Sequence, residues 1–293
     1  MTDAWRFFRV LVARSQRLSP SFLRVTFAGP DLDRFADNGY DQRIKLVLPL
    51  PECGVAYLPT GPDWYARWRG LSDVRRNPIR TYTVRAVRRH LAEVDVDVVL
   101  HGDAGPASRW ANRVRPGDEV ALLGPDTGFP GDHGGVEFRP HPDVTTVLLA
   151  GDETAVPAIA SIVERLKPDQ AGEALLEVPR AEDVLDIAAP SGFAVTWLPR
   201  GSGRHGTQLL PAVRAAADRL LPAPTVDRAL PDVDVDTEIL WEVPDPSGSS
   251  YAWLAGEAAM IRDLRRYLVG ERGLDRASVA FMGYWRRGRS EGA

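Results

Sequence analysis

The sequence predicts two domains, an N-terminal antiparallel β-barrel followed by a doubly wound α/β domain with a mostly parallel sheet. The chain has 293 residues, more than one average domain needs. Short apolar or alternating segments fill its first half, and apolar runs alternate with helical patterns after residue 144. The stretch 131–142 between them is rich in glycine and proline. We therefore expect domains of 1–140 and 141–293.

In the first half, four segments besides 80–83 are expected as strands and one segment is expected as a short helix. Residues 92–98 alternate between apolar and acidic side chains, which places Val94 and Val96 on one face and Asp95 and Asp97 on the other. Several short strands with a single helix are typical of a small barrel. The expected strands are 22–27, 43–48, 92–98 and 120–123, and the expected helix is 107–114.

In the second half, strands and helices alternate, as in a doubly wound sheet. The run 144–150 is largely apolar, as expected for a strand buried on both faces. The other expected strands are 174–178, 194–198, 238–242, 251–255 and 278–282. The expected helices are 155–166, 208–221 and 258–270, and the acidic, proline-rich stretch 222–236 is expected to be a surface loop.

Composition excludes several classes of protein. The net charge of −4 argues against a general nucleic-acid binder. The single cysteine, Cys53, rules out a disulfide within the chain and an iron–sulfur cluster held by its cysteines. No apolar run approaches the roughly 20 residues of a membrane span, and the first residues lack the apolar core of a signal peptide. We expect a cytoplasmic monomer without membrane insertion.

Two segments about twenty residues apart suit a flavin dinucleotide. The first carries a cation, a ring and two hydroxyls on an expected strand, namely Arg80, Tyr82, Thr81 and Thr83. The second, residues 101–108, passes through glycines and begins a helix at Pro106. The N–H groups of Ala107 and Ser108 at that helix start favour an anion. Together these groups match a diphosphate that carries a flat heterocycle, as FAD does.

These segments, with three others, resemble the siderophore-interacting protein family. The matching segments are 63–78, 80–83, 101–111, 151–159 and 283–288, and the resemblance extends from about residue 5 to 288. It implies a FAD-dependent ferric-siderophore reductase built on the ferredoxin–NADP reductase plan, with NADPH or NADH as electron donor. It also implies that the chemistry takes place on the flavin, without a catalytic acid or base from the chain.

The resemblance assigns roles to the first domain. Arg80 would bind a FAD phosphate, Tyr82 would pack on the flavin rings, and Thr83 would approach the reactive edge. Further FAD contacts are expected at Thr81, His101, Gly102, Gly105, Ala107 and Ser108. A structural histidine remains the alternative for His101, and Trp110 suits the core as well as the cofactor.

The resemblance also places the turn 151–155 between FAD and the nicotinamide nucleotide. It assigns FAD contacts to Asp152, Thr154 and Ala155, and nucleotide contacts to Gly151 and Glu153. The alternative is a plain strand-to-helix turn with Thr154 as N-cap. A second such turn assigns nucleotide contacts to Gly256 and Glu257, and there Glu257 also suits a first-turn acid favoured by the helix dipole.

Two apparent motifs in the second half are weaker indications of function. Residues 201–206 match G-x-G-x-x-G, but they follow a later strand, so we reject a dinucleotide fingerprint. Arg200 and Arg204 remain candidates for an adenosine ribose phosphate, which would favour NADPH, and exposed arginines are the alternative. His133, His141 and Asp143 fit no standard metal site, and we expect no metal.

Substrate contacts are expected from basic residues. Lys45 looks like a lysine that the family uses to attract ferric siderophores, and Arg43 lies two residues before it on the same strand face. The C-terminal tail would return to the flavin, where Tyr284 and Trp285 would cover its face and Arg286 would meet an anionic substrate.

Three alternatives stay open. Reduced ferredoxin is another possible donor, since an arginine-rich surface suits an acidic carrier. A flavin or quinone reductase has the same fold. A siderophore-binding carrier without turnover belongs to a different functional class.

Overall fold

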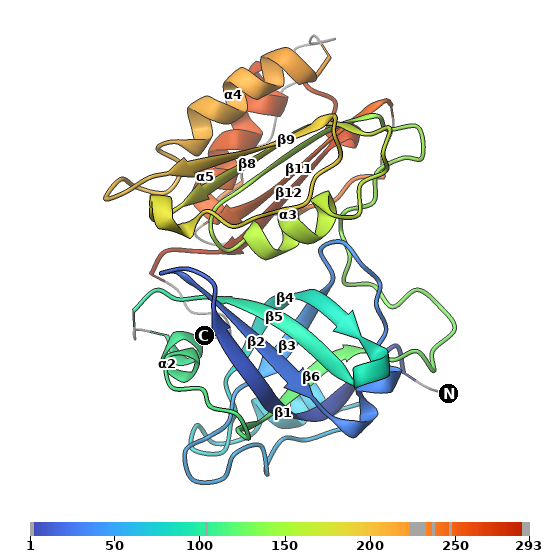
Figure 1. The fold of residues 1–293 in the computed structure, drawn as a ribbon, viewed down its shortest axis with the longest axis vertical. Coiled ribbons are helices and arrows are strands. Elements are labelled where there is room, and N and C mark those ends of the chain that lie inside the picture. Colours follow the sequence, from blue (N-terminus) through green and yellow to red (C-terminus); the bar gives the residue numbers. More distant parts are fainter. Residues whose placement is uncertain (1–2, 103–104, 223–232, 236–237, 246–247, 289–293) are drawn as a thin grey trace. The chain divides into compact units, whose positions relative to one another are not determined.

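The computed structural model describes residues 3–102, 105–222, 233–235, 238–245 and 248–288. It contains two compact units, one reaching to Val136 and the other running from Glu137 to Ser290. The first unit is a closed barrel and the second is a six-stranded sheet with helices on its faces (Figure 1). The predicted fold class is therefore confirmed.

The barrel is antiparallel, with strand order β1-β2-β5-β4-β3-β6. Its strands are β1 (Trp5–Arg17), β2 (Phe22–Ala28), β3 (Arg43–Val47), β4 (Ile79–Arg88), β5 (Glu93–Val99) and β6 (Glu119–Pro125). Its short helices are η1 (Pro30–Arg34), α1 (Trp64–Arg69), η2 (Arg89–Leu91) and α2 (Pro106–Ala111). The sequence analysis did not assign β1, which closes the barrel by pairing with both β2 and β6.

The alternation in β5 explains its packing. Val94, Val96 and Val98 are fully buried in the barrel core, as the sequence predicted. Asp95 and Asp97 lie on the other face and are buried beneath arginine side chains from neighbouring strands. We call this group the barrel ladder: Arg14, Arg24, Arg85, Arg88, Glu93, Asp95 and Asp97.

In the second unit the strand order is β10-β12-β11-β7-β8-β9. Its strands are β7 (Thr146–Gly151), β8 (Ala171–Val178), β9 (Phe193–Pro199), β10 (Trp241–Glu242), β11 (Ser250–Glu257) and β12 (Val279–Trp285). Neighbours are parallel except β10, which pairs antiparallel with β12. Because β7, β11 and β12 are adjacent and parallel, their carboxyl ends meet at one edge of the sheet.

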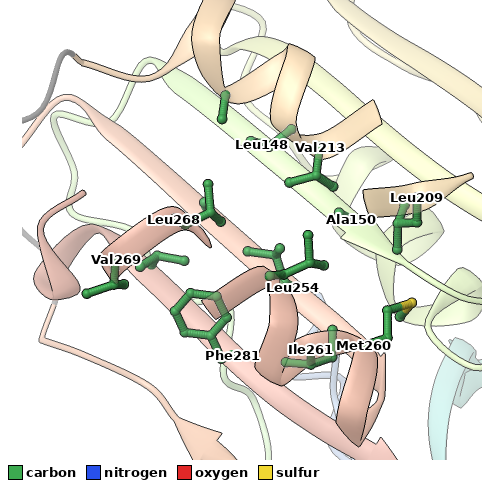
Figure 2. Packing of buried hydrophobic residues seen from close by; sticks show 14 of the residues in the cluster. Leu148, Ala150, Leu209, Val213, Leu254, Met260, Ile261, Leu268, Val269 and Phe281 are labelled. Carbon is green, nitrogen blue, oxygen red and sulfur yellow. The ribbon is translucent and has the colours of Figure 1, made fainter. Parts of the chain in front are cut away.

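Helices cover both faces of this sheet (Figure 1). The helices are α3 (Val156–Val163), α4 (Leu209–Leu220), α5 (Ala258–Arg265) and the short turns η3 (Ala181–Asp183) and η5 (Arg276–Ser278). The helices α4 and α5 share one face, where Leu209, Val213 and Ile261 pack on Leu254 and Phe281 from the strands. Figure 2 shows this cluster, with side chains from strands and helices pointing toward one another.

The structure corrects several expected elements. The helix expected over 258–270 is α-helical only to Arg265 and continues as a π-helix over Arg266–Glu271. The strand expected at 238–242 shrinks to two residues of β10, and α2 ends at Ala111 rather than 114. Most of the 222–236 loop lies outside the described residues. Among the described helices, none combines the length and apolar character that crossing a membrane requires.

Candidate functional site

The carboxyl end of β7 brings two acidic side chains to the edge of the sheet. Gly151 ends the strand where a Cβ atom would lie 2.5 Å from the Ala155 Cβ and 2.6 Å from the Ala255 carbonyl oxygen. Glycine therefore lets the chain turn tightly between β11 and the start of α3. Asp152 and Glu153 follow directly, at the position where open α/β sheets bind ligands.

Asp152 is fully buried and ties three strand ends together. Its Oδ2 accepts hydrogen bonds from the Glu257 backbone nitrogen (2.8 Å) and from Trp285 Nε1 (2.9 Å). Its Oδ1 accepts from the backbone nitrogen of Thr154 (2.9 Å) and from Thr154 Oγ1 (2.5 Å). The carboxyl thus connects the end of β7 with the ends of β11 and β12.

Burial raises the pKa of Asp152, and the negative charge of Glu153 raises it further, to about 6. The hydrogen bonds from Thr154 and Trp285 act in the opposite direction but do not cancel the rise. The carboxyl therefore takes up its proton at a higher pH than an ordinary aspartic acid does.

Glu153 has the opposite electrostatic state. Arg200 donates to both of its oxygens, at 2.6 and 2.7 Å, and His205 Nε2 lies 3.1 Å from Oε1. Burial alone would raise the pKa of Glu153, but the bonds from His205 and Arg200 lower it to about 2. We call Asp152, Glu153, Arg200 and His205 the edge cluster.

His205 connects this cluster with the end of the chain. Its ring meets the Trp285 indole edge to face, with centroids 4.9 Å apart. Burial lowers the pKa of His205, but the hydrogen bond and the charge of Glu153 raise it above the usual value. The sequence analysis gave His205 no role.

The start of α4 is occupied by a side chain of the protein itself. Both oxygens of Glu177, a fully buried residue of β8, accept backbone N–H bonds from Gly206, Gln208 and Leu209. A phosphate cannot take that position while the carboxylate fills it, so the rejection of 201–206 as a fingerprint is confirmed. One signal had been available, since Glu177 interrupts the otherwise apolar segment 174–178 that was expected as a strand.

The two turns at the edge show their structural roles clearly. Glu257 is the N-cap of α5, and its Oε2 accepts from the Met260 backbone nitrogen at 3.0 Å. Thr154 is not the N-cap of α3, which is Ala155, because the Thr154 hydroxyl bonds to Asp152 instead. The nucleotide contacts predicted for Gly256 and Glu257 stay predictions.

The structure gives Arg200 an internal partner. Its side chain is 8% exposed, is bonded at both ends to Glu153, and lies 4.0 Å from Glu177. Its guanidinium thus lies between two buried acids, and the expectation that it binds a ribose phosphate stays a prediction. Arg204 is exposed and remains a candidate.

Within the described residues, the groups that could hold a metal come together at Asp152, Glu153 and His205. The donor set does not suit a cation. Arg200 already neutralises Glu153, and the His205 nitrogen that points into the group is bonded to the same carboxylate.

The two aromatic residues near the C-terminus do not act as a pair. Consecutive residues of β12 point in opposite directions. Tyr284 stacks on Trp241 and meets Trp253 edge to face, whereas Trp285 turns to Asp152 and His205. The expectation that both rings cover a flavin is wrong for this reason. Arg286 donates to the Val235 carbonyl oxygen.

In the barrel, the register between β3 and β4 sorts the predicted residues onto two faces. Arg80 pairs with Leu46, and Tyr82 with Ile44, so both face the side of the barrel core. Tyr82 packs partly against that core. Arg80 is half-buried, donates to the Ile79 carbonyl oxygen at 2.7 Å, and has no acidic partner among the described residues.

The other face of β3 and β4 carries the predicted substrate residues. Lys45 lies opposite Thr81, and its Nζ donates to Thr81 Oγ1 at 2.6 Å. Arg43 lies opposite Thr83, which is 6% exposed. The prediction that Arg43 and Lys45 share a face is confirmed, and this face is the opposite one from Arg80 and Tyr82.

The second barrel motif is only partly described, because residues 103 and 104 lie outside the described ranges. His101 is exposed and its Nδ1 lies 3.4 Å from Ser108 Oγ. Gly102 has a φ of +63°, which turns the chain after the strand. Gly105 is extended and precedes α2, where Ala107 is half-buried and Ser108 is buried. Trp110 stacks on Phe27 at 6.3 Å, so it belongs to the core.

Family models match both units of the chain. Residues 11–129 match the siderophore-interacting FAD-binding domain, and residues 144–288 match the siderophore-interacting protein model. An uncharacterized protein of Mycobacterium tuberculosis is 36% identical over 96% of this chain and 90% of the relative. The ferric vibriobactin reductase ViuB of Vibrio cholerae is 30% identical over 96% of this chain and 89% of the relative.

Two further matches extend this likeness. The NADPH-dependent ferric-chelate reductase of Escherichia coli is 27% identical over 96% of this chain and 93% of its own length. The crystal structure of the siderophore-interacting protein SipS from Aeromonas hydrophila aligns with a TM-score of 0.69 at 31% identity, covering 98% of this chain and 94% of SipS.

Proposed function

Because this chain belongs to the siderophore-interacting protein family, we propose that it is an oxidoreductase that reduces ferric siderophores with electrons from NAD(P)H. FAD is its cofactor, through the family's FAD-binding domain at residues 11–129. Reduction releases the metal, because siderophore oxygens hold iron(III), a hard ion, more tightly than iron(II).

The residues of the barrel fit FAD, and Arg80 carries this argument. The ladder arginines elsewhere on the barrel are matched by Glu93, Asp95 or Asp97, whereas Arg80 meets no acid among the described residues. A half-buried arginine without an anion suits a phosphate, which accepts charge-assisted hydrogen bonds from a guanidinium. We infer that Arg80 holds the FAD diphosphate.

When bound, FAD would supply the redox chemistry that links a nicotinamide, which gives up two electrons together, to iron(III), which takes up one. The chain supplies binding and orientation. Tyr82 offers a ring beside Arg80 on the same strand face, and the buried hydroxyl of Thr83 lies next to it in the chain. The remaining flavin contacts, at His101, Gly102, Gly105, Ala107, Ser108, Asp152, Thr154, Ala155 and Trp285, stay predictions.

Lys45, Arg43 and Arg286 are proposed to attract the ferric siderophore. A siderophore that binds iron through catecholate or carboxylate oxygens is an anion. The two cations on one face of β3 would attract it even on a protein with a net charge of −4. The predictions of a cytoplasmic location and a monomer stay untested.

The nicotinamide donor is supported by the E. coli relative, whose name states NADPH dependence. An anaerobic titration of the purified protein separates the possible functions. We expect flavin absorbance that NADPH or NADH bleaches and that a ferric siderophore restores, with iron(II) trapped by a chromogenic chelator. Bleaching by reduced ferredoxin alone would change the donor. If only quinones restore the bleached absorbance, the protein is a quinone reductase instead. If it binds a siderophore but holds no flavin, it is a carrier without turnover.

A pair of variants tests the FAD site itself. Arg80→Ala should weaken FAD binding by roughly tenfold or more, since a hydrogen bond to a charged group contributes about 1.5–3 kcal/mol. Arg115→Ala removes an exposed arginine of the same unit and should retain FAD. Equal FAD affinity in both variants, measured by flavin fluorescence, would overturn the role of Arg80.

A further inference from the structure

The hydrogen bonding of Asp152 is complete, yet it includes no cation. An ionised carboxylate offers about four acceptor positions. Here four donors fill them, namely the backbone nitrogens of Thr154 and Glu257, the Thr154 hydroxyl and the Trp285 indole nitrogen. The neighbouring Glu153 instead accepts hydrogen bonds from two guanidinium nitrogens of Arg200 and lies within hydrogen-bond distance of His205 Nε2.

The backbone is built to admit this carboxylate. Gly256 has a φ of +150°, and a Cβ atom there would lie 2.8 Å from Asp152 Oδ2 and 2.8 Å from Met260 Cε. Any other residue would push the carboxylate off the Glu257 nitrogen. Glycine at 256 therefore makes room for the contact between β7 and β11.

We propose that Asp152 is a positioning residue whose carboxylate holds the indole of Trp285, and that protonation of this carboxyl weakens the hold. The inference rests on the proposed function, because Trp285 is among the residues that we propose to contact FAD. It assigns to the second unit a group that sets the orientation of an aromatic ring according to pH.

The donors determine where the proton goes. An N–H group cannot accept a hydrogen bond, so the bonds to Oδ2 from Glu257 and Trp285 keep their direction. The Thr154 hydroxyl is the one donor of the four that can reverse, and it bonds to Oδ1. A proton on Oδ1 can then be donated to Thr154 Oγ1. The bond from Trp285 survives, but it loses the charge assistance that shortens and strengthens such bonds.

Several charged groups face Asp152 and set the pH of this change. Burial and the charge of Glu153 raise the pKa of Asp152 to about 6. Arg200 and His205 bind that same Glu153, and the carboxylate of Glu257 is turned to the α5 N-terminus. His205 also touches the Trp285 ring, and its own pKa is raised above the usual value. The titration of His205 must therefore be separated from that of Asp152.

The indole N–H signal of Trp285 tests the proposal without any turnover. The chain has eight tryptophans, so protein labelled with ¹⁵N in its indole rings gives few signals, and Trp285→Phe identifies the one of interest. We expect that signal to move between pH 5 and 8 with a midpoint near 6. Trp68 is the internal control, since its Nε1 donates to the Asn77 carbonyl oxygen and should not follow the same step.

Variants assign the step to its group. Asp152→Asn should abolish it, whereas His205→Asn should leave it, because an asparagine can still donate to Glu153. A Trp285 signal that does not change between pH 5 and 8 in the unaltered protein overturns the proposal without any variant. A step that persists in Asp152→Asn, or disappears in His205→Asn, assigns the titration to His205 and equally overturns it.

The reaction supplies a second readout. If the hold on Trp285 matters for iron reduction, the pH profile of kcat should show a step near the midpoint of the Trp285 signal, and Asp152→Asn should remove that step. A protein that reduces no ferric siderophore but shows the titration refutes the proposed function alone. A protein that reduces ferric siderophores with no Trp285 titration refutes the positioning role alone.

Discussion

The barrel ladder and the edge cluster both combine arginine with buried or half-buried acids, but they leave these acids in different protonation states. In the ladder, Arg88 binds Asp95 at 2.6 Å and Glu93 at 3.0 Å, and Arg14 binds Glu93 at 2.7 Å. In the edge cluster, Arg200 and His205 both bind Glu153, and Asp152 beside it bonds only to neutral donors.

The pKa values follow this distribution of cations. The bond from Arg14 is the largest cause that lowers the pKa of Glu93, to about 2, and Arg88 adds to it. Burial would raise the pKa of Asp95, but its bonds from Arg88 and Thr26 lower it. At the edge, the pKa of Glu153 falls to about 2 while that of Asp152 rises to about 6.

The difference teaches how a protein keeps a buried acid able to take up a proton. In the ladder, Glu93 and Asp95 each contact an arginine that lowers the pKa of the carboxyl, so these two acids stay charged. The edge cluster gives its cations to one acid and leaves the other with N–H and O–H donors. Perturbed acids of the second kind are typical of functional sites.

The largest loss of folding stability is expected from Arg200→Met in the edge cluster. The variant would leave Glu153 and Glu177 buried without their arginine, and breaking a buried pair from one side costs about 3–5 kcal/mol. Urea unfolding at pH 7 measures the loss. Arg204→Met, in the exposed part of the same segment, is the control. A loss in Arg200→Met no greater than in this control would contradict the buried state of the cluster.

A smaller effect is expected from Arg88→Met in the ladder. Arg88 is 26% exposed, and its removal leaves the buried Asp95 with the Thr26 hydroxyl at 2.7 Å. An unsatisfied buried group costs about 1–3 kcal/mol, and the partial exposure of Arg88 keeps the value within that range. Arg9→Met breaks an exposed pair with Glu119 and serves as control. If Arg88→Met destabilises the protein as much as Arg200→Met does, the different exposure of the two arginines does not determine their contributions to stability.

The sequence predicted on which strand face the acids of the ladder lie, but it did not predict which arginines bind them. Strict alternation in 92–98 placed Asp95 and Asp97 on the face away from the core, because a strand's side chains alternate by geometry alone. Which arginines cover them depends on barrel closure, and the strand that supplies Arg14, β1, was not recognised.

In the edge cluster, too, the sequence predicted local positions but not the contacts between distant residues. The position of residues 151–155 at the end of a parallel strand was predictable from an apolar run followed by a helical pattern. The bond between Asp152 and Trp285 joins residues 133 positions apart, and it depends on the order of strands in the sheet. Local sequence carries no signal for that order, and the pair between Arg200 and Glu153 was likewise not predicted.

A pH-dependent effect, smaller again, is expected from His205→Asn. The folded-state pKa of His205 is raised above its unfolded value of about 6.5. The protonated histidine therefore stabilises the fold fully below about pH 6.5, and this contribution is lost as the pH rises through the folded value. We expect the variant to be less stable than the unaltered protein at pH 6, with a smaller difference at pH 9. Urea midpoints at both values measure it, and a difference that grows with pH would contradict the bond to Glu153.

The smallest effect is expected from Arg14→Gln, at the exposed end of the ladder. Arg14 is 55% exposed, and solvent and salt screen its pair with Glu93, which keeps the bond from Arg88 when Arg14 is lost. The urea midpoint at pH 7 should therefore stay unchanged within measurement error, at low salt and in 0.5 M NaCl alike. A loss of stability as large as that of Arg88→Met would mean that the number of bonds, rather than burial, determines how much these groups stabilise the fold. The contrast between ladder and edge would then depend on cation count alone, and Asp152 would differ from Glu93 only because no arginine reaches it.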